Sequence, residues 1–237
     1  MMQYTMPTTR QIAGREAKLF GHVFEHRVCD VLSSRFKQDF IHDGSCNTKV
    51  DIRSEDDTMR FSVKKTPTDL QVGLITQQNF IEAMNITDNK IEQFISEFFG
   101  GDTVASFSRH RKKIDEIDQT LVDAFEQFLD SSKEDIFRVA ITHGGLNHYD
   151  NVNYMLFPDV RHDISTMKKI DLSSLLDDIK KNSVWRFNPT TIDLLIDGVK
   201  VINIQMFGSG RKYSNGYHSL QFRIACGKIN SRHVSWL

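Results

Sequence analysis

TKVDIR at residues 48–53 and MRFSVK at residues 59–64 decide the fold that we expect for this chain. Apolar and polar residues alternate in both segments. The polar residues 54–58 end both apolar runs, which is typical of two strands joined by a turn. If Arg53 pairs with Arg60 across this turn, the polar side chains of both strands fall on one face. The sequence therefore predicts a hairpin with one apolar and one polar face.

The polar face of this hairpin would hold a carboxylate, a hydroxyl and an ammonium. In the expected register, Asp51 lies opposite Ser62 and diagonal to Lys64. Such a patch suits a hydrolytic Mg²⁺ site, because Mg²⁺ prefers oxygen ligands and a nearby ammonium can orient a water and favour its deprotonation. The backbone carbonyl of Val63 would be a further ligand. A cross-strand ion pair between Asp51 and Lys64 accounts for the same spacing.

Composition favours a soluble globular protein. The chain has 237 residues, of which 39% are hydrophobic and 26% charged, enough to bury a substantial core. No apolar run approaches the roughly 18 residues of a membrane span, and residues 1–5 lack the features of a signal peptide. Three widely spaced cysteines, Cys29, Cys46 and Cys226, favour reduced thiols over a disulfide framework. We therefore expect a cytoplasmic protein without a membrane segment.

A helix is expected before the hairpin. In residues 12–36, Phe20, Phe24, Val28 and Val31 recur at helical spacing and predict its core-facing side. The segment that joins this helix to the hairpin, residues 36–46, is expected to be irregular.

The segments after the hairpin predict a mixed fold. Asp197-Gly198 between two apolar runs indicates a tight hairpin turn. We expect an α+β fold, α/β/α sandwich-like, with a mixed β-sheet core flanked by helices and a β-rich C-terminal part. Residues 1–100 would form the core, and residues 101–237 a helical and β-rich part packed with it as one compact unit. Residues 70–75 are expected to be a strand or the approach to a helix. Further strands are expected at residues 154–157, 192–196, 201–206 and 220–225, and further helices at residues 76–84, 88–99, 114–128, 135–141 and 172–180.

Positive charge is concentrated toward the C-terminus. The net charge of −1 argues against a protein that coats nucleic acids, but residues 158–237 carry 12 lysines and arginines against 7 aspartates and glutamates. A localised polyanion-binding face and a chance gradient on a solvated surface both fit this distribution. In the glycine-rich loop at residues 207–216, Arg211, Lys212 and Asn215 are suitable donors for guanine edges or phosphates.

Three short motifs, GHVFE at residues 21–25, KVD at 49–51 and SVK at 62–64, resemble the catalytic motifs of the PD-(D/E)xK nuclease superfamily. More narrowly, the chain is similar to the small type II restriction endonucleases that cut four-base-pair sites, those of the MspI and HhaI kind. The apolar strand at 201–206 and LQFR at 220–223 add to the resemblance. Each motif alone is unspecific, whereas their order and spacing together favour a nuclease.

The resemblance implies Mg²⁺-dependent hydrolysis of double-stranded DNA at a short specific sequence, with one or two Mg²⁺ ions and products that carry 5′-phosphates. Asp51, Glu25 and the carbonyl of Val63 would hold the metal. Lys64 would position and activate the attacking water, and Ser62 would assist by hydrogen bonding. The enzyme would act as a monomer, residues 1–100 would be its catalytic part, and a cognate DNA methyltransferase would be its genetic partner.

Contacts with DNA are expected from the loop after the hairpin and from the glycine-rich loop. For Gln71, an ordinary loop glutamine is an equally good interpretation. The residues expected to contact DNA are Lys65, Gln71, Arg211, Lys212, Tyr213 and Asn215.

Two alternatives remain open. Ser62 stands where the general motif has a second acidic residue, so the metal site lacks one negative charge. The first alternative is therefore a sequence-specific DNA-binding protein on an inactive nuclease scaffold. The less favoured alternative is a zinc peptidase. Its basis is the motif His22-x-x-Glu25-His26, which places two histidines one helical turn apart. The acidic residues of the turn, 55–57, are expected to be solvated.

Overall fold

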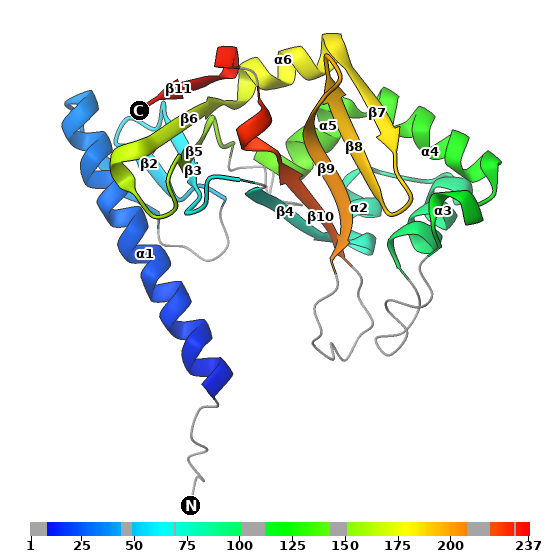
Figure 1. The fold of residues 1–237 in the computed structure, drawn as a ribbon, viewed down its shortest axis with the longest axis horizontal. Coiled ribbons are helices and arrows are strands. Elements are labelled where there is room, and N and C mark those ends of the chain that lie inside the picture. Colours follow the sequence, from blue (N-terminus) through cyan, green and yellow to red (C-terminus); the bar gives the residue numbers. More distant parts are fainter. Residues whose placement is uncertain are drawn as a thin grey trace, which may run out of the picture.

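Two β-sheets and the helices packed on them make up the described part of the chain (Figure 1). The computed structural model describes residues 9–43, 49–68, 70–100, 112–142, 151–207, 219–229 and 231–237. The α+β class expected from the sequence is confirmed. Among the described residues, no helix combines the length and the apolar character that crossing a lipid bilayer requires.

The first sheet contains the predicted hairpin and is mixed. Its strands are antiparallel except for β3 and β5, which pair in parallel. A parallel pair needs a long crossover, and here the chain between them passes through much of the second sheet's helical layer. The strands, in spatial order, are β1 (Phe40–His42), β2 (Ile52–Ser54), β3 (Arg60–Val63), β5 (Tyr154–Pro158), β6 (Met167–Asp171) and β11 (Val234–Trp236).

The register of the β2–β3 hairpin agrees with the sequence prediction. Arg53 pairs with Arg60. The carboxylate of Asp56 accepts hydrogen bonds from the Ser54 hydroxyl at 2.6 Å and the Thr58 hydroxyl at 2.9 Å, and Asp57 forms an ion pair with Arg60. Both aspartates therefore belong to the turn, as expected.

The second sheet is antiparallel and covers a large aromatic core. Its apolar face packs on helices α2 (Gln77–Ala83), α3 (Asn89–Phe99) and α4 (Gln119–Ser131), where the rings of Phe94 and Phe125 stack at 4.3 Å between centroids. The strands, in spatial order, are β4 (Leu70–Thr76), β10 (Ser219–Ile224), β9 (Val199–Phe207), β8 (Thr191–Ile196) and β7 (Ser183–Phe187).

Both sheets combine strands from distant parts of the chain. β3 pairs with β5, and β4 pairs with β10, so each sheet draws strands from both sides of residue 100. Two further helices are α5 (Lys133–Phe137), which continues as a π-helical turn (Arg138–Thr142), and α6 (Leu172–Asn182). In Figure 1, α6 lies along the edge where the two sheets come together.

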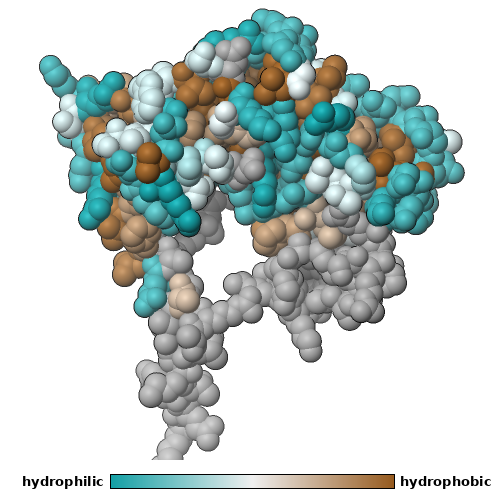
Figure 2. Space-filling view, viewed as in Figure 1, coloured by the Kyte–Doolittle hydropathy of each residue, from teal (hydrophilic) through white to brown (hydrophobic). Residues whose placement is uncertain are grey.

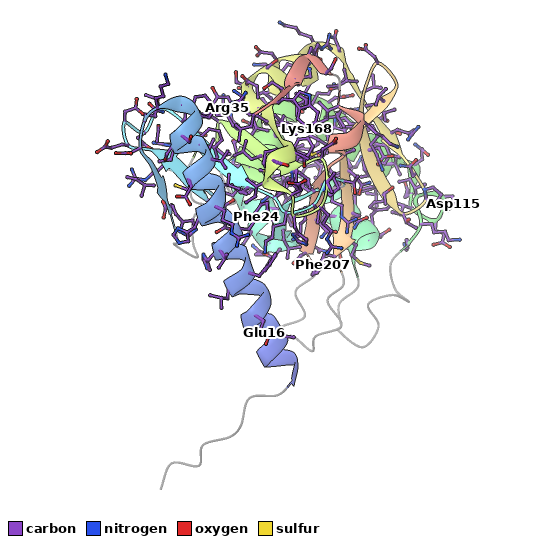
Figure 3. The ribbon with its side chains drawn as sticks, turned by 60° about the vertical axis from the view of Figure 1, so that its left-hand side comes forward. Glu16, Phe24, Arg35, Asp115, Lys168 and Phe207 are labelled. Atoms are coloured by element: carbon purple, nitrogen blue, oxygen red, sulfur yellow. The ribbon has the colours of Figure 1, made fainter. Side chains whose placement is uncertain are left out.

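Among the described side chains of helix α1 (Thr9–Phe36), those that pack on the first sheet lie in its C-terminal half. Phe24 and Val28 are buried there, together with Leu32, which the predicted stripe did not contain. Figure 3 shows Phe24 where the helix meets the body and Glu16 on the half that projects beyond it.

The predicted core positions Phe20 and Val31 are wrong, because both side chains are exposed. Phe20 lies on α1 ahead of the buried row, where its ring contacts His162 and the ammonium of Lys65. Val31 is one position away from the row formed by Phe24, Val28 and Leu32, which are spaced by four residues. Figure 2 shows hydrophobic surface on the projecting part of α1, where Leu19 and Phe20 are more than half exposed.

Four strands were not predicted. β1 lies within the segment that was expected to be irregular, and β6, β7 and β11 also carry no clear sequence signal. β1 and β11 have three residues each, too few to display an alternation, and their formation depends on pairing with β2 and β6.

Candidate active site and metal centre

The carboxylate of Asp51 lies where β2 and β3 separate. The backbone N–H of Asp51 donates to the carbonyl of Phe61 at 2.8 Å, which continues the hairpin by one residue. Its Oδ2 atom accepts the backbone N–H of Val63 at 2.6 Å and the Ser62 hydroxyl at 3.2 Å. The structure therefore brings together Asp51 and Ser62, as the expected register requires.

The backbone of Val63 faces this carboxylate. In an extended strand, the N–H and C=O of one residue point toward the same neighbouring strand. Because the N–H of Val63 points at Asp51 and that of Lys64 points at Leu156 of β5, the carbonyl of Val63 also faces the Asp51 side. Two oxygen donors from adjacent strands are thus directed to one region.

Burial and the charge of Lys64 have the largest effects on the pKa of the Asp51 carboxyl. Burial raises the pKa of the Asp51 carboxyl above its ordinary value, and the charge of Lys64 and the Val63 N–H only partly oppose that shift. Lys64 is partly buried at the end of β3, and its ammonium has no hydrogen bond or ion pair with another described residue. Lys64 is therefore near enough to act on Asp51 without being tied to it.

Lys49 is a site residue that sequence reasoning did not single out. Its ammonium donates to the carbonyl of Ala140 in the π-helical turn. Burial, followed by the charge of Lys64, lowers the pKa of Lys49 to about 7, although Asp51 acts in the opposite direction. The motif Lys49-x-Asp51 was visible in the sequence, but the burial that gives Lys49 its unusual pKa depends on the distant turn at Arg138–Thr142.

Glu25 is brought near Asp51 by α1, but its carboxylate contacts histidines. Glu25 Oε2 lies 2.9 Å from His42 Nε2 and 3.5 Å from His22 Nδ1. The charge of Glu25 contributes to the raised pKa of Asp51, so the two carboxylates interact. His42 was missed because it belongs to β1, and His26, which the peptidase motif requires, does not join this group.

The residues expected to contact DNA lie in different places. The ammonium of Lys65 lies 5.7 Å from the ring centroid of Phe20, against α1. Gln71 is exposed on β4 in the second sheet, and its Oε1 accepts a hydrogen bond from Gln221, which in turn accepts one from Gln205. Gln71 is therefore in a strand and not in a loop. Arg211, Lys212, Tyr213 and Asn215 lie outside the described residues.

A second polar cluster, absent from the sequence predictions, fastens the C-terminal segment to α6. Nδ1 of His233 lies 2.8 Å from the Ser174 hydroxyl, and Nε2 lies 2.8 Å from Asp178 Oδ2. Burial alone would raise the pKa of the Asp178 carboxyl, but hydrogen bonds from His233, Asn182 and Arg232 outweigh it and hold that pKa below its ordinary value. The cluster is spread over residues 59 positions apart, which no local motif indicates.

Comparison with known proteins adds no relationship to this geometry. No protein-family model matches the chain, and a search of curated proteins finds no match.

Proposed function

We propose that the protein is a Mg²⁺-dependent endonuclease of the PD-(D/E)xK kind that cleaves double-stranded DNA at a short specific sequence. The observation that carries the proposal is the position of the Asp51 carboxylate. It lies between two strands, 2.6 Å from the backbone N–H of Val63, with Lys64 at the end of the same strand. A salt bridge alone would not account for this arrangement, because Lys64 forms no ion pair with Asp51 among the described contacts.

The donor atoms fit a hard divalent cation. Asp51 is partly buried, and burial makes its negative charge unfavourable, as the raised pKa of its carboxyl indicates. A cation held by this carboxylate and by the Val63 carbonyl would relieve that cost, and oxygen donors are those that Mg²⁺ prefers. When bound, Mg²⁺ would supply neutralisation of the negative charge that develops on the phosphate. Glu25 would complete the set directly or through water, for one or two ions.

The remaining groups have roles that follow from their positions. Lys64, with an ammonium that has no partner among the described residues, would orient the attacking water and favour its deprotonation. The Ser62 hydroxyl donates to Asp51 and would fix the orientation of that carboxylate. The partly buried Lys65 and the exposed Gln71, together with the basic loop at residues 207–216, would contact the DNA. A restriction enzyme of this kind would act as a monomer with a DNA methyltransferase as its genetic partner.

Plasmid cleavage with a matched pair of lysine variants tests the proposal. The wild type should give discrete fragments with 5′-phosphate ends in Mg²⁺ and none in a chelator. Lys64→Ala should lower the cleavage rate by about 10²–10⁴-fold, the usual contribution of a positioned acid–base group. Lys200→Ala, which removes a lysine from β9 in the other sheet, should leave the rate unchanged.

Three other results of the cleavage experiment would change the assignment. Equal activity of Lys64→Ala and wild type would remove Lys64 from the mechanism. Specific gel shifts without cleavage, in Mg²⁺ and in Mn²⁺, would support the DNA-binding alternative, which the neutral Ser62 beside Asp51 favours. Neither binding nor cleavage across plasmids that together contain all short palindromes would overturn the proposed function.

A further inference from the structure

A second group of metal-binding side chains lies at the contact between α1 and β1. His22 and Glu25 are three positions apart on α1 and therefore share one face of the helix. His42 reaches the same point from β1, and one ligand atom of each residue lies within 4.8 Å of the others. We propose that His22, Glu25 and His42 form a binding site for a divalent transition-metal ion, with Zn²⁺ as the preferred ion. The inference does not rest on nuclease activity, although Glu25 is also the carboxylate proposed above to complete the Mg²⁺ set.

The spacing of the ligand atoms suits such an ion. Zn²⁺ binds nitrogen and carboxylate oxygen at about 2.0–2.2 Å, so two ligands of a tetrahedral site are about 3.3–3.6 Å apart. Glu25 Oε2 lies 2.9 Å from His42 Nε2 and 3.5 Å from His22 Nδ1. The distance from Glu25 to His22 falls in this range, the distance from Glu25 to His42 is shorter, and the ligand atoms of His22 and His42 lie within 4.8 Å, so small side-chain movements would form the site.

The donor set selects the class of metal and separates this site from the one at Asp51. Two imidazoles and one carboxylate suit Zn²⁺ and its neighbours among the transition metals, whereas Mg²⁺ favours oxygen donors. Three protein ligands leave at least one coordination position for water. The cluster and the Asp51 region would thus prefer different ions, although the charge of Glu25 acts on Asp51.

The two elements that carry the ligands are already fixed to one another. The Cys29 thiol donates to the carbonyl of Phe40 at 2.9 Å, and the N–H of Phe40 donates to the Ser33 hydroxyl at 3.2 Å. Both bonds join β1 to the C-terminal half of α1. The side chains of Glu25 and His42 are only 17% and 10% exposed, so their positions are restricted before any ion binds. Metal binding would therefore cross-link α1 and β1 with little further loss of side-chain conformational entropy.

His42, and not His26, is the second histidine of the site. Residues 22 and 26 are one helical turn apart and form the sequence motif. However, the described ligand group contains His22, Glu25 and His42. The His26 side chain is exposed, and its ring lies beside that of His42, with 4.2 Å between centroids. His26 therefore serves as a control histidine that lies close to the cluster but is not one of its ligands.

Metal titration of the full chain tests the site. Chelator-treated protein is titrated with Zn²⁺ by calorimetry and with Co²⁺ by visible absorption. The wild type should bind one tight equivalent that His42→Asn, His22→Asn and Glu25→Gln each weaken by at least about 100-fold. His26→Asn should bind within about threefold of wild type. Thermal unfolding of each variant without metal establishes that it is folded, and Zn²⁺ should raise the midpoint only where the site is intact.

Two results would overturn the proposal. If His26→Asn loses as much affinity as His42→Asn, the ions bind through the helical motif and not through the cluster of His22, Glu25 and His42. If no variant differs from wild type, the bound metal lies elsewhere in the chain. Should His42→Asn fail to fold, His22→Asn and Glu25→Gln on α1 decide the question alone. DNA cleavage is not a readout, so loss of the proposed nuclease function would leave this result unchanged.

Discussion

Individual residues around Asp51 are arranged at a cost to stability. A carboxyl whose pKa is higher in the folded protein than in the unfolded chain binds its proton more tightly when folded, so ionisation of Asp51 destabilises the fold. The unfolding free energy therefore falls as pH rises through the interval between the unfolded and the folded pKa of this carboxyl. Such a cost at a small group of polar side chains is typical of a functional site.

Asp51→Asn should raise the thermal unfolding midpoint at pH 8 in chelator, because the variant removes a buried charge but keeps an oxygen for the Val63 N–H. Cleavage should fall by more than about 100-fold. Mg²⁺ should stabilise the wild type and leave the variant unaffected. A midpoint below that of wild type would mean that the carboxylate stabilises the fold, contrary to the burial argument. Calorimetry at several pH values measures the difference.

Lys49 predicts a second pH dependence, of opposite sign. Its pKa of about 7 in the folded protein lies below that of an unfolded lysine, about 10.4, so the unfolded chain binds more protons between these values. The unfolding free energy contributed by this group therefore rises with pH, by about 2 kcal/mol between pH 7 and 9. The unfolding free energy of Lys49→Met should lack this rise with pH. It should exceed that of the wild type most clearly at acidic pH. Chemical denaturation at pH 6, 7 and 9 measures both free energies. If they change with pH in the same way in the wild type and the variant, the lowered pKa of Lys49 is refuted.

At the scale of elements, close packing between β4 and the π-helical turn determines where the Ala140 carbonyl lies. Gly73 on β4 faces the π-helical turn, and a Cβ atom placed on it would lie 2.5 Å from the carbonyl oxygen of Ala140. The same carbonyl accepts the hydrogen bond from Lys49. The absence of a side chain at Gly73 thus allows the turn to approach the second sheet and to meet a lysine next to the first.

Gly73→Ala should destabilise the fold by about 1–3 kcal/mol, because backbone atoms must move to admit the methyl group. The displaced carbonyl should also raise the pKa of Lys49 toward its ordinary value, by admitting water. Gly227→Ala is the matched control, since nothing lies within 4 Å of its added Cβ atom. Urea denaturation compares the two variants, and equal midpoints would show that the turn can yield without cost.

At the scale of the whole molecule, features governed by neighbouring residues could be predicted from the sequence. The pairing of Arg53 with Arg60 followed from alternation and a polar turn. The hairpin at Asp197-Gly198 followed from turn chemistry, and both residues have the positive φ angles, 51° and 77°, that this dipeptide tolerates. The juxtaposition of Asp51 and Ser62 followed from the same local register.

Features governed by distant residues could not be predicted. His42 joins Glu25 only because β1 adds to the edge of a sheet, and a three-residue strand has no periodicity of its own. The buried face of α1 depends on which part of the helix the first sheet covers, so Phe20 was wrongly assigned to the core. The burial of Lys49 depends on Ala140, 91 positions later. In each case tertiary contacts decided what local propensity left open.

The long-range pairing of both sheets has a consequence for biosynthesis. While a ribosome extends the chain, β3 has no parallel partner until β5 at Tyr154–Pro158 emerges, and β4 must wait for β10 at Ser219–Ile224. A nascent or prematurely terminated polypeptide would contain the hairpin that brings Asp51 and Ser62 together, but not the strand β5, whose Leu156 carbonyl accepts the backbone N–H of Lys64. Under the function proposed above, cleavage would then begin only after β10 has been synthesised, and products that end before it would not cut the DNA of the cell that makes them.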